Sequence, residues 1–165
     1  MSASTRLLAM REDFFPVFFE IAVANYAAEN VLGGRWPAGD APALAREETR
    51  RLLAQGLATP DHHLFELHAG PGDTPVGFLW LAQLPRGQEQ AVFVFQIHVE
   101  PEHRRQGHAR AALQAAEAWA RQRGAASLAL HVFAHNTGAR ALYDSLGLAV
   151  SSLNLIKRLE PPAAD

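Results

Sequence analysis

The sequence contains no cysteine, and that absence removes several kinds of chemistry at once. Without cysteine the chain has no disulfide, no thiolate nucleophile and no thiolate ligand for zinc. Catalysis by this chain must therefore use other side chains. The sequence also lacks an apolar run near the ~20 residues that a membrane span needs, and its N-terminus lacks the apolar core of a signal peptide. We expect a soluble cytoplasmic protein.

An excess of positive charge is missing as well. The 15 Lys and Arg residues stand against 17 Asp and Glu residues, which gives a formal net charge of −2. This balance provides no electrostatic argument for nucleic acid or a membrane surface as a partner. Apolar residues are abundant, at 48% of the 165 residues. A chain of this length can bury roughly two thirds of its unfolded surface, and we expect a single domain over residues 1–165.

The eight histidines raise the question of a metal site. His131 and His135 are four residues apart, and in an extended strand that spacing spans ~13 Å, too far for two ligands of one ion. The sequence contains no His-Glu-x-x-His helix motif. We therefore predict no metal site.

A short apolar run, residues 92–99, has the composition of a buried strand. Its residues are mostly β-branched or aromatic, which is typical of a strand buried on both faces, and Pro101 ends it. Apolar residues then recur with the spacing of one helical face from Ala109 to Ala120, and Gly124 suits the C-terminus of that helix. We predict a strand followed by a helix that begins near Gly107.

The turn between this strand and this helix is rich in arginine. Arg104, Arg105 and Arg110 surround the predicted helix start, where free N–H groups and the positive end of the helix dipole favour an anion. Gly107 would let a ligand approach the backbone closely. The stretch alone is equally consistent with a solvated charged turn. The glycine-rich fingerprints of nucleotide-binding folds are absent, because only one glycine stands here.

Turn-forming residues and apolar periodicity divide the rest of the chain. Asp13 is the predicted N-cap of a first helix whose core-facing residues are Phe14, Phe18, Ile21 and Ala28. In chain order we predict a strand over residues 5–10, helices over 14–29 and about 40–56, hairpin strands over 64–69 and 76–84, a strand over 127–133, a helix over 139–146 capped by Asn136, and closing strands over 148–151 and 153–159. The strand over 127–133 should lie parallel to 92–99, because a helix connects the two.

The loop over residues 31–40 is rich in glycine and proline and places Arg35 beside Trp36. These residues can contact a substrate, although packing is the more common role for such a tryptophan. His62 and Trp80 are further candidates for the wall of an acceptor cleft, with simple exposure as the alternative for His62.

Two segments together resemble the GNAT family of N-acetyltransferases. Arg104-x-x-Gly107-x-Ala109 is similar to that family's Arg/Gln-x-x-Gly-x-Gly/Ala acetyl-CoA motif, and Asn136-x-x-Ala139-x-x-Leu142-Tyr143 followed by Leu146-Gly147 is similar to its second signature. Ala109 stands where glycine is frequent, and Leu148 where an aromatic residue is usual. The resemblance covers residues 92–159 strongly and the earlier half only by the order of its elements.

The resemblance implies both a fold and a cosubstrate. The fold would be α/β (α+β), with a mixed, mostly antiparallel sheet, a central parallel strand pair and helices on both faces. Backbone amides of the arginine-rich turn would hold the pyrophosphate of acetyl-CoA, and the strand before it would pair with the pantetheine arm, to which Asn136 would also bond. The implied cofactor-binding residues are Ile97, Val99, Arg104, Arg105, Gln106, Gly107, His108, Ala109, Arg110, Asn136 and Ala139.

Tyr143 matches the position of the family's usual general acid, so the resemblance makes it the catalytic residue. A phenol with a pKa of ~10 is protonated at neutral pH and can donate its proton to a departing thiolate. The main-chain N–H near Val99 can polarise the thioester oxygen. The acceptor of the amine's proton is open among His98, Glu100 and a chain of water molecules, and His98 is equally interpretable as a core histidine.

We therefore expect an acetyl-CoA-dependent N-acetyltransferase that transfers an acetyl group directly to a primary amine of a small molecule or peptide. The resemblance also makes a homodimer possible, although nothing in the sequence specifies an interface. The alternative from another class is a non-catalytic acyl-CoA-binding sensor or interaction module, which would keep the phosphate turn without a productive acceptor site. Both hypotheses predict that the cofactor binds.

Overall fold

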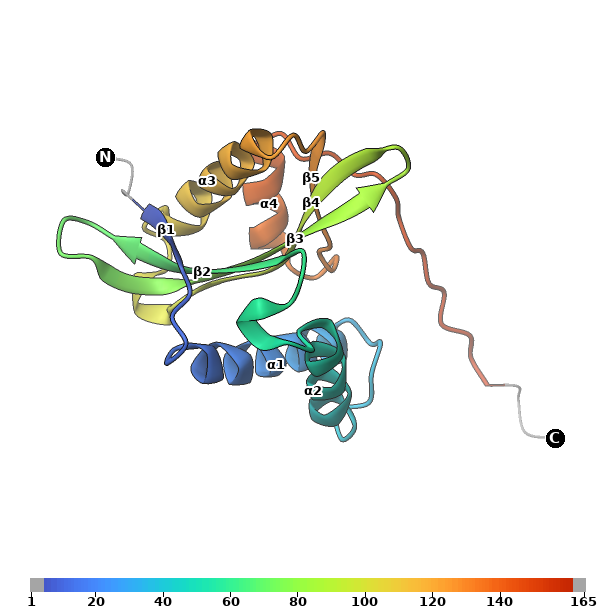
Figure 1. Cartoon of the computed structure of the whole chain (residues 1–165). Coiled ribbons are helices and arrows are strands. Elements are labelled where there is room, and N and C mark those ends of the chain that lie inside the picture. Colours follow the sequence, from blue (N-terminus) through green and yellow to red (C-terminus); the bar gives the residue numbers. More distant parts are fainter. Residues whose placement is uncertain (1–4, 162–165) are drawn as a thin grey trace.

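One five-stranded sheet organises the computed structural model, which describes residues 5–161 (Figure 1). The strands follow one another across the sheet in the order β1-β2-β3-β4-β5. Within residues 5–161, no helix combines the length and the apolar character that crossing a bilayer requires. The elements in chain order are β1 (Thr5–Ala9), α1 (Phe15–Leu32), α2 (Ala41–Leu52), η1 (Gly56–Ala58), β2 (His62–Ala69), β3 (Thr74–Arg86), β4 (Glu89–Val99), η2 (Pro101–His103), α3 (His108–Gln122), β5 (Ser127–Leu130) and α4 (Thr137–Ser145).

The sheet is mixed and mostly antiparallel. Neighbouring strands from β1 to β4 run antiparallel, whereas β4 and β5 run parallel. A parallel pair requires a crossover connection, and α3 supplies it between β4 and β5. The predicted hairpin from β2 to β3, its continuation into β4 and the parallel pair are therefore confirmed. The pair was predicted at the centre of the sheet, whereas it lies at one side of the described sheet, where β5 is the last strand.

Helices cover both faces of the sheet, as predicted (Figure 1). Alternation along β3 sends Phe78 and Trp80 to one face, where both rings meet Phe18 of α1 edge-on. Leu79 and Leu81 point to the other face and pack against the apolar stripe of α3. Each of these five side chains is at most 2% exposed, so β3 lies in the centre of the core.

The first helix differs from its prediction at its start and on its buried face. The residue in front of α1 is Phe14, which makes no side-chain hydrogen bond to the helix, so Asp13 is not its cap. Ala28 is exposed, whereas the other three residues predicted to face the core do pack there. The second half of α1 packs against α2 through Val23 and Ala27. Its buried stripe therefore turns toward α2 and leaves Ala28 on the outside.

The two closing strands predicted over residues 148–159 do not form. After α4 the described chain has no regular secondary structure and runs along the outside of the molecule (Figure 1). A strand needs a neighbour for its N–H and C=O groups, and no backbone hydrogen bond joins residues 149–161 to the rest of the described chain. The apolar pattern of a strand is present, but the partner strand is not.

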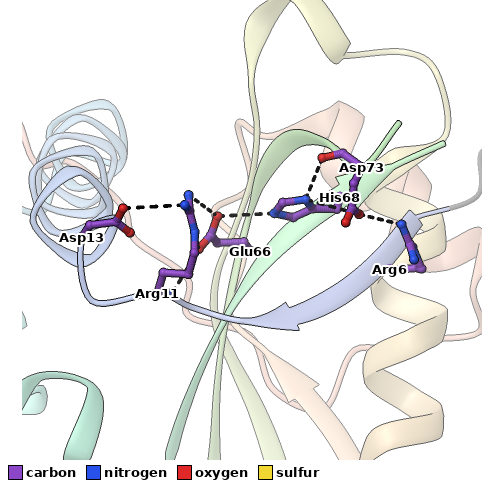
Figure 2. Close-up of polar contacts among 6 residues, drawn as sticks. All are labelled: Arg6, Arg11, Asp13, Glu66, His68 and Asp73. Atoms are coloured by element: carbon purple, nitrogen blue, oxygen red, sulfur yellow. Dashed lines mark hydrogen bonds and ion pairs between the residues drawn. The ribbon is translucent and has the colours of Figure 1, made fainter. Parts of the chain in front are cut away.

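A buried carboxylate on β2 ties the start of the chain to the β2–β3 hairpin (Figure 2). The Glu66 side chain is 2% exposed and accepts hydrogen bonds from the backbone N–H, Nε and Nη2 of Arg11 at 3.0, 3.1 and 3.3 Å. Nε2 of His68 lies 3.3 Å from the same carboxylate, and Nδ1 of that ring lies 2.9 Å from the Asp73 carbonyl oxygen. The Asp73 carboxylate in turn pairs with Arg6 of β1 at 2.5 Å. The network fixes β1 and the entry into α1.

The charge of Glu66 makes this network sensitive to pH. Burial raises the pKa of the Glu66 carboxyl, but the hydrogen bonds from Arg11 and His68 outweigh burial and hold that pKa below its usual value. A carboxyl whose pKa is lowered by folding stabilises the fold above its unfolded pKa. This contribution is lost as the pH falls through the folded pKa.

Replacing Glu66 by glutamine should lower the free energy of unfolding by ~1–2 kcal/mol at pH 7, because Arg11 and His68 lose a charged acceptor. In urea titrations at pH 7 and at the lowest pH where the wild type stays folded, the difference from the wild type should be smaller at the lower pH, because protonation also neutralises the wild-type carboxyl. Glu47→Gln is the control, since Glu47 makes only an exposed ion pair with Arg50 at 3.6 Å. An equal cost of Glu66→Gln at both pH values would contradict the linkage.

Candidate active site

β4 and β5 pair over only part of their length. β4 runs to Val99, whereas its parallel pairing with β5 ends at Val94, opposite Leu130. β5 stops there, three residues short of its predicted end at Phe133. The register between β3 and β4 also shifts beside Phe95, immediately after this pairing ends. The last five residues of β4 therefore have β3 on one side and an opening on the other.

The main chain of Ile97 and Val99 faces this opening. The N–H of Glu100 donates to the Val76 carbonyl oxygen of β3 at 2.9 Å. Backbone groups alternate sides along a strand, so those of Ile97 and Val99 point away from β3. The Val99 carbonyl accepts a hydrogen bond from Nε of Arg104 at 2.9 Å. Of the two backbone groups of Val99, the carbonyl is therefore used by Arg104, and the N–H is the one that faces the opening.

The turn that follows β4 holds two residues in the left-handed backbone region. Arg105 has a φ of 61° and Gly107 a φ of 90°. This conformation costs an arginine on the order of 1 kcal/mol, and left-handed residues let successive N–H groups converge on one point. Within residues 5–161 no carbonyl accepts a hydrogen bond from the N–H of Arg105, Gln106 or Gly107. These donors stand at the N-terminus of α3, where the helix dipole adds positive potential.

The three arginines of this turn do not gather around one point. Arg104 turns back to the end of β4 through its bond to the Val99 carbonyl. Arg110 donates from Nη2 to Ser145 Oγ of α4 at 2.6 Å. Arg105 is exposed. Two of the three guanidinium groups therefore hold the turn and α4 in place, and the backbone supplies the unpaired donors.

The side chain of His108 lies in the packing between α3 and β1. It is buried, and its Nδ1 lies 3.0 Å from Thr5 Oγ1. Burial lowers the pKa of His108, and the nearby His103 lowers it further. The His108 side chain therefore points into the packing, and only its main chain belongs to the turn before α3.

Asn136 caps the helix that follows β5, as predicted. Its Oδ1 accepts a hydrogen bond from the Ala139 N–H at 3.2 Å, and α4 begins at Thr137. The cap uses the side-chain oxygen and leaves the amide NH₂ group for a second partner.

Tyr143 lies in the second turn of α4 and packs, partly buried, against the core on the α3 face. Burial raises the pKa of its phenol, and the negative charge of Glu29 on α1 raises it further. The hydroxyl is therefore protonated throughout the neutral range. α1 and α4 lie on opposite faces of the sheet (Figure 1).

A contact between α1 and the β5–α4 loop joins these two sides, and the sequence does not signal it. Nε2 of His135 lies 3.0 Å from the Glu29 carboxylate, across 106 residues of chain. The Phe133 ring packs so closely on Gly33 that a Cβ atom built there would lie 2.6 Å from it. Phe133 leaves the line of β5 because its ring packs on the end of α1.

His98 lies on the face of β4 that α1 covers and is held from three sides. The side-chain nitrogen of Asn25 lies 3.1 Å from Nδ1, so the amide donates and the ring proton sits on Nε2. The ring stacks on Phe78 with a centroid distance of 5.0 Å. Nε2 has no hydrogen-bond partner in the described chain and lies 3.5 Å from the Glu100 carboxylate. His98 is thus packed as a core histidine and also adjoins an acid.

The aromatic residues proposed for an acceptor cleft belong to the core. Trp80 is buried, stacks on Phe95 at 4.8 Å and donates its indole N–H to Nδ1 of His62 at 2.9 Å. Burial lowers the pKa of His62. Trp36 packs edge-on against Tyr26 at 5.1 Å, which confirms the packing interpretation.

Comparison with known proteins gives this arrangement a family. The model of the acetyltransferase (GNAT) family matches residues 18–148, from α1 through α4. The chain belongs to the GNAT acetyltransferase family. The predicted family is confirmed, and membership assigns the protein to acetyl transfer.

Relatives of this GNAT chain align along nearly its whole length. The uncharacterized N-acetyltransferase YycN of Bacillus subtilis (strain 168) is 35% identical over 153 residues, 93% of this chain and 97% of that protein. The uncharacterized N-acetyltransferase YdgE of the same organism is 31% identical over 150 residues, 91% of this chain and 95% of that protein. The crystal structure of YycN matches with a TM-score of 0.89 at 34% identity and covers 96% of this chain and 100% of its own. The predicted GNAT fold is therefore confirmed.

In this GNAT protein, Asn136→Ala should lower the free energy of unfolding by ~1 kcal/mol, because the Ala139 N–H loses its acceptor. Asn136→Ser keeps an oxygen at the cap position and should stay within ~0.5 kcal/mol of the wild type. Urea unfolding followed by circular dichroism measures both. If the two variants lost the same stability, the hydrogen bond to Ala139 would not be what starts α4.

Proposed function

We propose that this GNAT protein is an acetyl-CoA-dependent N-acetyltransferase that transfers the acetyl group directly to a primary amine of a small molecule or peptide. The observation that carries the proposal is the opening between β4 and β5, which leads to the unpaired N–H groups at residues 105–107. Ligands of open α/β sheets bind beyond the carboxyl ends of the strands. Both features lie at that end of the parallel pair.

The turn at residues 105–107 suits the phosphates of coenzyme A. Unpaired N–H groups at a helix N-terminus are a general anion site, and a left-handed arginine is a strained conformation of the kind found at ligand sites. The main chain of Ile97 and Val99 and the amide NH₂ of Asn136 would pair with the pantetheine arm. Bound acetyl-CoA would supply an acetyl group activated as a thioester.

Tyr143 is the proposed proton donor. A bond forms between the amine nitrogen and the acetyl carbon while the carbon–sulfur bond breaks, and Tyr143 Oη gives its proton to the sulfur. The raised pKa of Tyr143 keeps that proton in place at neutral pH. The Val99 N–H would donate a hydrogen bond to the acetyl oxygen as negative charge develops there.

Glu100 is the proposed acceptor of the amine's proton, with His98 behind it. Glu100 follows β4 directly, next to the Val99 N–H, and its side chain is 33% exposed. The His98 ring is 11% exposed and directs Nε2 at the Glu100 carboxylate. Nε2, which carries the ring proton, faces the Glu100 carboxylate and orients it, and the carboxylate would take the proton of the amine through water. Asn25 and Phe78 would keep that ring in position.

Tyr143→Phe should lower kcat by ~100-fold, because the departing sulfur loses its proton donor. The dissociation constant of acetyl-CoA should stay within about twofold, since the phenol oxygen is not proposed to bind the cofactor. Release of coenzyme A thiol during turnover with a panel of amines gives kcat, and the chain has no cysteine to react with the thiol reagent. Calorimetry gives the dissociation constant.

The same panel separates the enzyme from the non-catalytic acyl-CoA-binding module. Acetyl-CoA binding without thiol release by any diamine, amino acid, aminoglycoside or peptide N-terminus would favour the binding module. An unchanged kcat in Tyr143→Phe would remove Tyr143 as the acid and leave the rest of the proposal standing. Absence of acetyl-CoA binding would refute both functions.

Glu100→Gln should lower kcat by ~10- to 100-fold at pH 7, because it removes the carboxylate and keeps the shape of the side chain. Glu102→Gln is the matched control: Glu102 is an exposed acid two residues further on, in η2. Its replacement should leave kcat unchanged. If Glu100→Gln kept the kcat of the wild type between pH 6 and 9, water alone would carry the proton away.

A further inference from the structure

One face of α1 contacts both sides of the opening between β4 and the chain that follows β5. On the β4 side, the Ala22 carbonyl accepts a hydrogen bond from Nε2 of Gln96 at 2.8 Å. One turn further along α1, the Asn25 side chain lies 3.1 Å from the His98 ring. Gln96 and His98 belong to the part of β4 that β5 does not pair with. This stretch of α1 therefore lies against the β4 side of the opening.

The same face of α1 continues to the other side of the opening. Asn25 and Glu29 are four residues apart, so they point to the same side of the helix, about 6 Å apart along its axis. Nε2 of His135 lies 3.0 Å from the Glu29 carboxylate. Beyond it, the Phe133 ring packs on Gly33 at the end of α1. α1 thus spans the opening on one face of the sheet.

The proposed reaction places the acceptor amine on this face. Tyr143, the proposed proton donor, packs against the core on the α3 face. His98 lies on the face that α1 covers and directs Nε2 at Glu100, the proposed proton acceptor. The amine has to lie near the group that takes its proton. A substrate bound there meets the turn of α1 from Asn25 to Glu29.

Glu29 adds a second negative charge on this side of the opening. Its side chain is 40% exposed, and its one ion-pair partner among residues 5–161 is His135. A histidine donates a hydrogen bond to a carboxylate in its neutral form as well, so this contact does not have to cancel the charge. The charge also reaches the reacting end, since it raises the pKa of Tyr143. The proposed reaction uses Glu100 and leaves Glu29 without a role.

Aromatic rings lie beside the Glu29 carboxylate. Alternate residues after β5 bring His131, Phe133 and His135 into one row. The ring centroids are 4.9 Å apart in the edge-on first pair and 5.5 Å apart in the stacked second pair. Such rings pack against aliphatic chains and attract organic cations. A carboxylate at the end of this row suits the far end of an aliphatic amine that carries a second positive charge.

We propose that the Glu29 carboxylate binds a second positive charge of the acceptor, so that the substrate is an aliphatic diamine. One amino group reacts beside Glu100, and the other stays protonated at Glu29. His135 is a positioning residue whose hydrogen bond holds the carboxylate at the opening. The proposal rests on the proposed acetyl transfer, because it names the acceptor of that reaction. An acceptor with a carboxylate at its far end is disfavoured, since Glu29 would repel it.

Calorimetry of the full chain in the presence of coenzyme A tests this cation site without turnover, because coenzyme A has no acetyl group to transfer. The probes are aliphatic diamines of three to six carbons, each compared with the monoamine of the same length. At least one diamine should bind ~10- to 100-fold more tightly than its monoamine, the range expected for a hydrogen bond between charged groups. Equal affinities along the series, or no binding by any diamine, overturn the proposal.

Glu29→Gln should remove the preference for the diamine and leave the dissociation constant of the monoamine within about twofold. Glutamine keeps an oxygen for His135 and removes only the charge, so a merely structural role of Glu29 would survive the substitution. The matched control is Glu20→Gln on the same helix, where the carboxylate pairs with Arg46 at 2.6 Å. This control should keep the preference. A preference that persists in Glu29→Gln contradicts the assignment of Glu29.

Release of coenzyme A thiol separates this proposal from the proposed acetyl transfer. With acetyl-CoA, Glu29→Gln should raise KM for the preferred diamine by ~10- to 100-fold and change kcat by less than about threefold. A diamine that binds through Glu29 without releasing thiol refutes acetyl transfer and supports the cation site. Thiol release with equal KM for diamines and monoamines overturns the cation site and leaves acetyl transfer standing.

Discussion

The parallel pairing of β4 and β5 stops halfway along β4, and the rest of the structure depends on that stop. Pairing continued to Val99 would have saturated the backbone and closed the sheet. Instead the register of β3 and β4 shifts at Phe95, and Phe133 turns its ring onto the end of α1. The packing of Phe133 on α1, on one face of the sheet, thus determines where β5 ends. The opening is a product of packing as much as of strand geometry.

The elements predicted well from the sequence are those whose signal is local. α3 follows from the spacing of its apolar residues, the β4–β5 pair follows from the helix between them, and the cap of α4 follows from Asn136. The GNAT motifs located the Arg-rich turn and Tyr143 because each motif lies within a dozen residues. Glu29 and His135 escaped prediction, since 106 residues separate them and neither has a distinctive neighbourhood. Ala28 was misplaced because the contact with α2, not the sheet, orients that end of α1.

The closing strands failed for a different physical reason. The alternation of apolar residues after Gly147 is real, but a strand is a property of two segments, and one sequence shows only one of them. The arginines illustrate a related limit. Charge counted along the turn suggested that guanidinium groups would face an anion, whereas Arg104 and Arg110 are used to hold neighbouring elements. The donors left over belong to the main chain, whose directions depend on the left-handed conformation of Arg105.

The network around Glu66 also bears on where this domain begins. The family match starts at residue 18, after β1 and after Arg11. A protein trimmed to residues 18–148 would keep every residue of the proposed site. It would nevertheless lose β1, so that β2 would become an exposed edge of the sheet. The Glu66 carboxylate would stay buried without the Arg11 cation that pairs with it. The matched region therefore contains the residues of the proposed site, whereas the folded domain also includes β1 and Arg11, which precede that region.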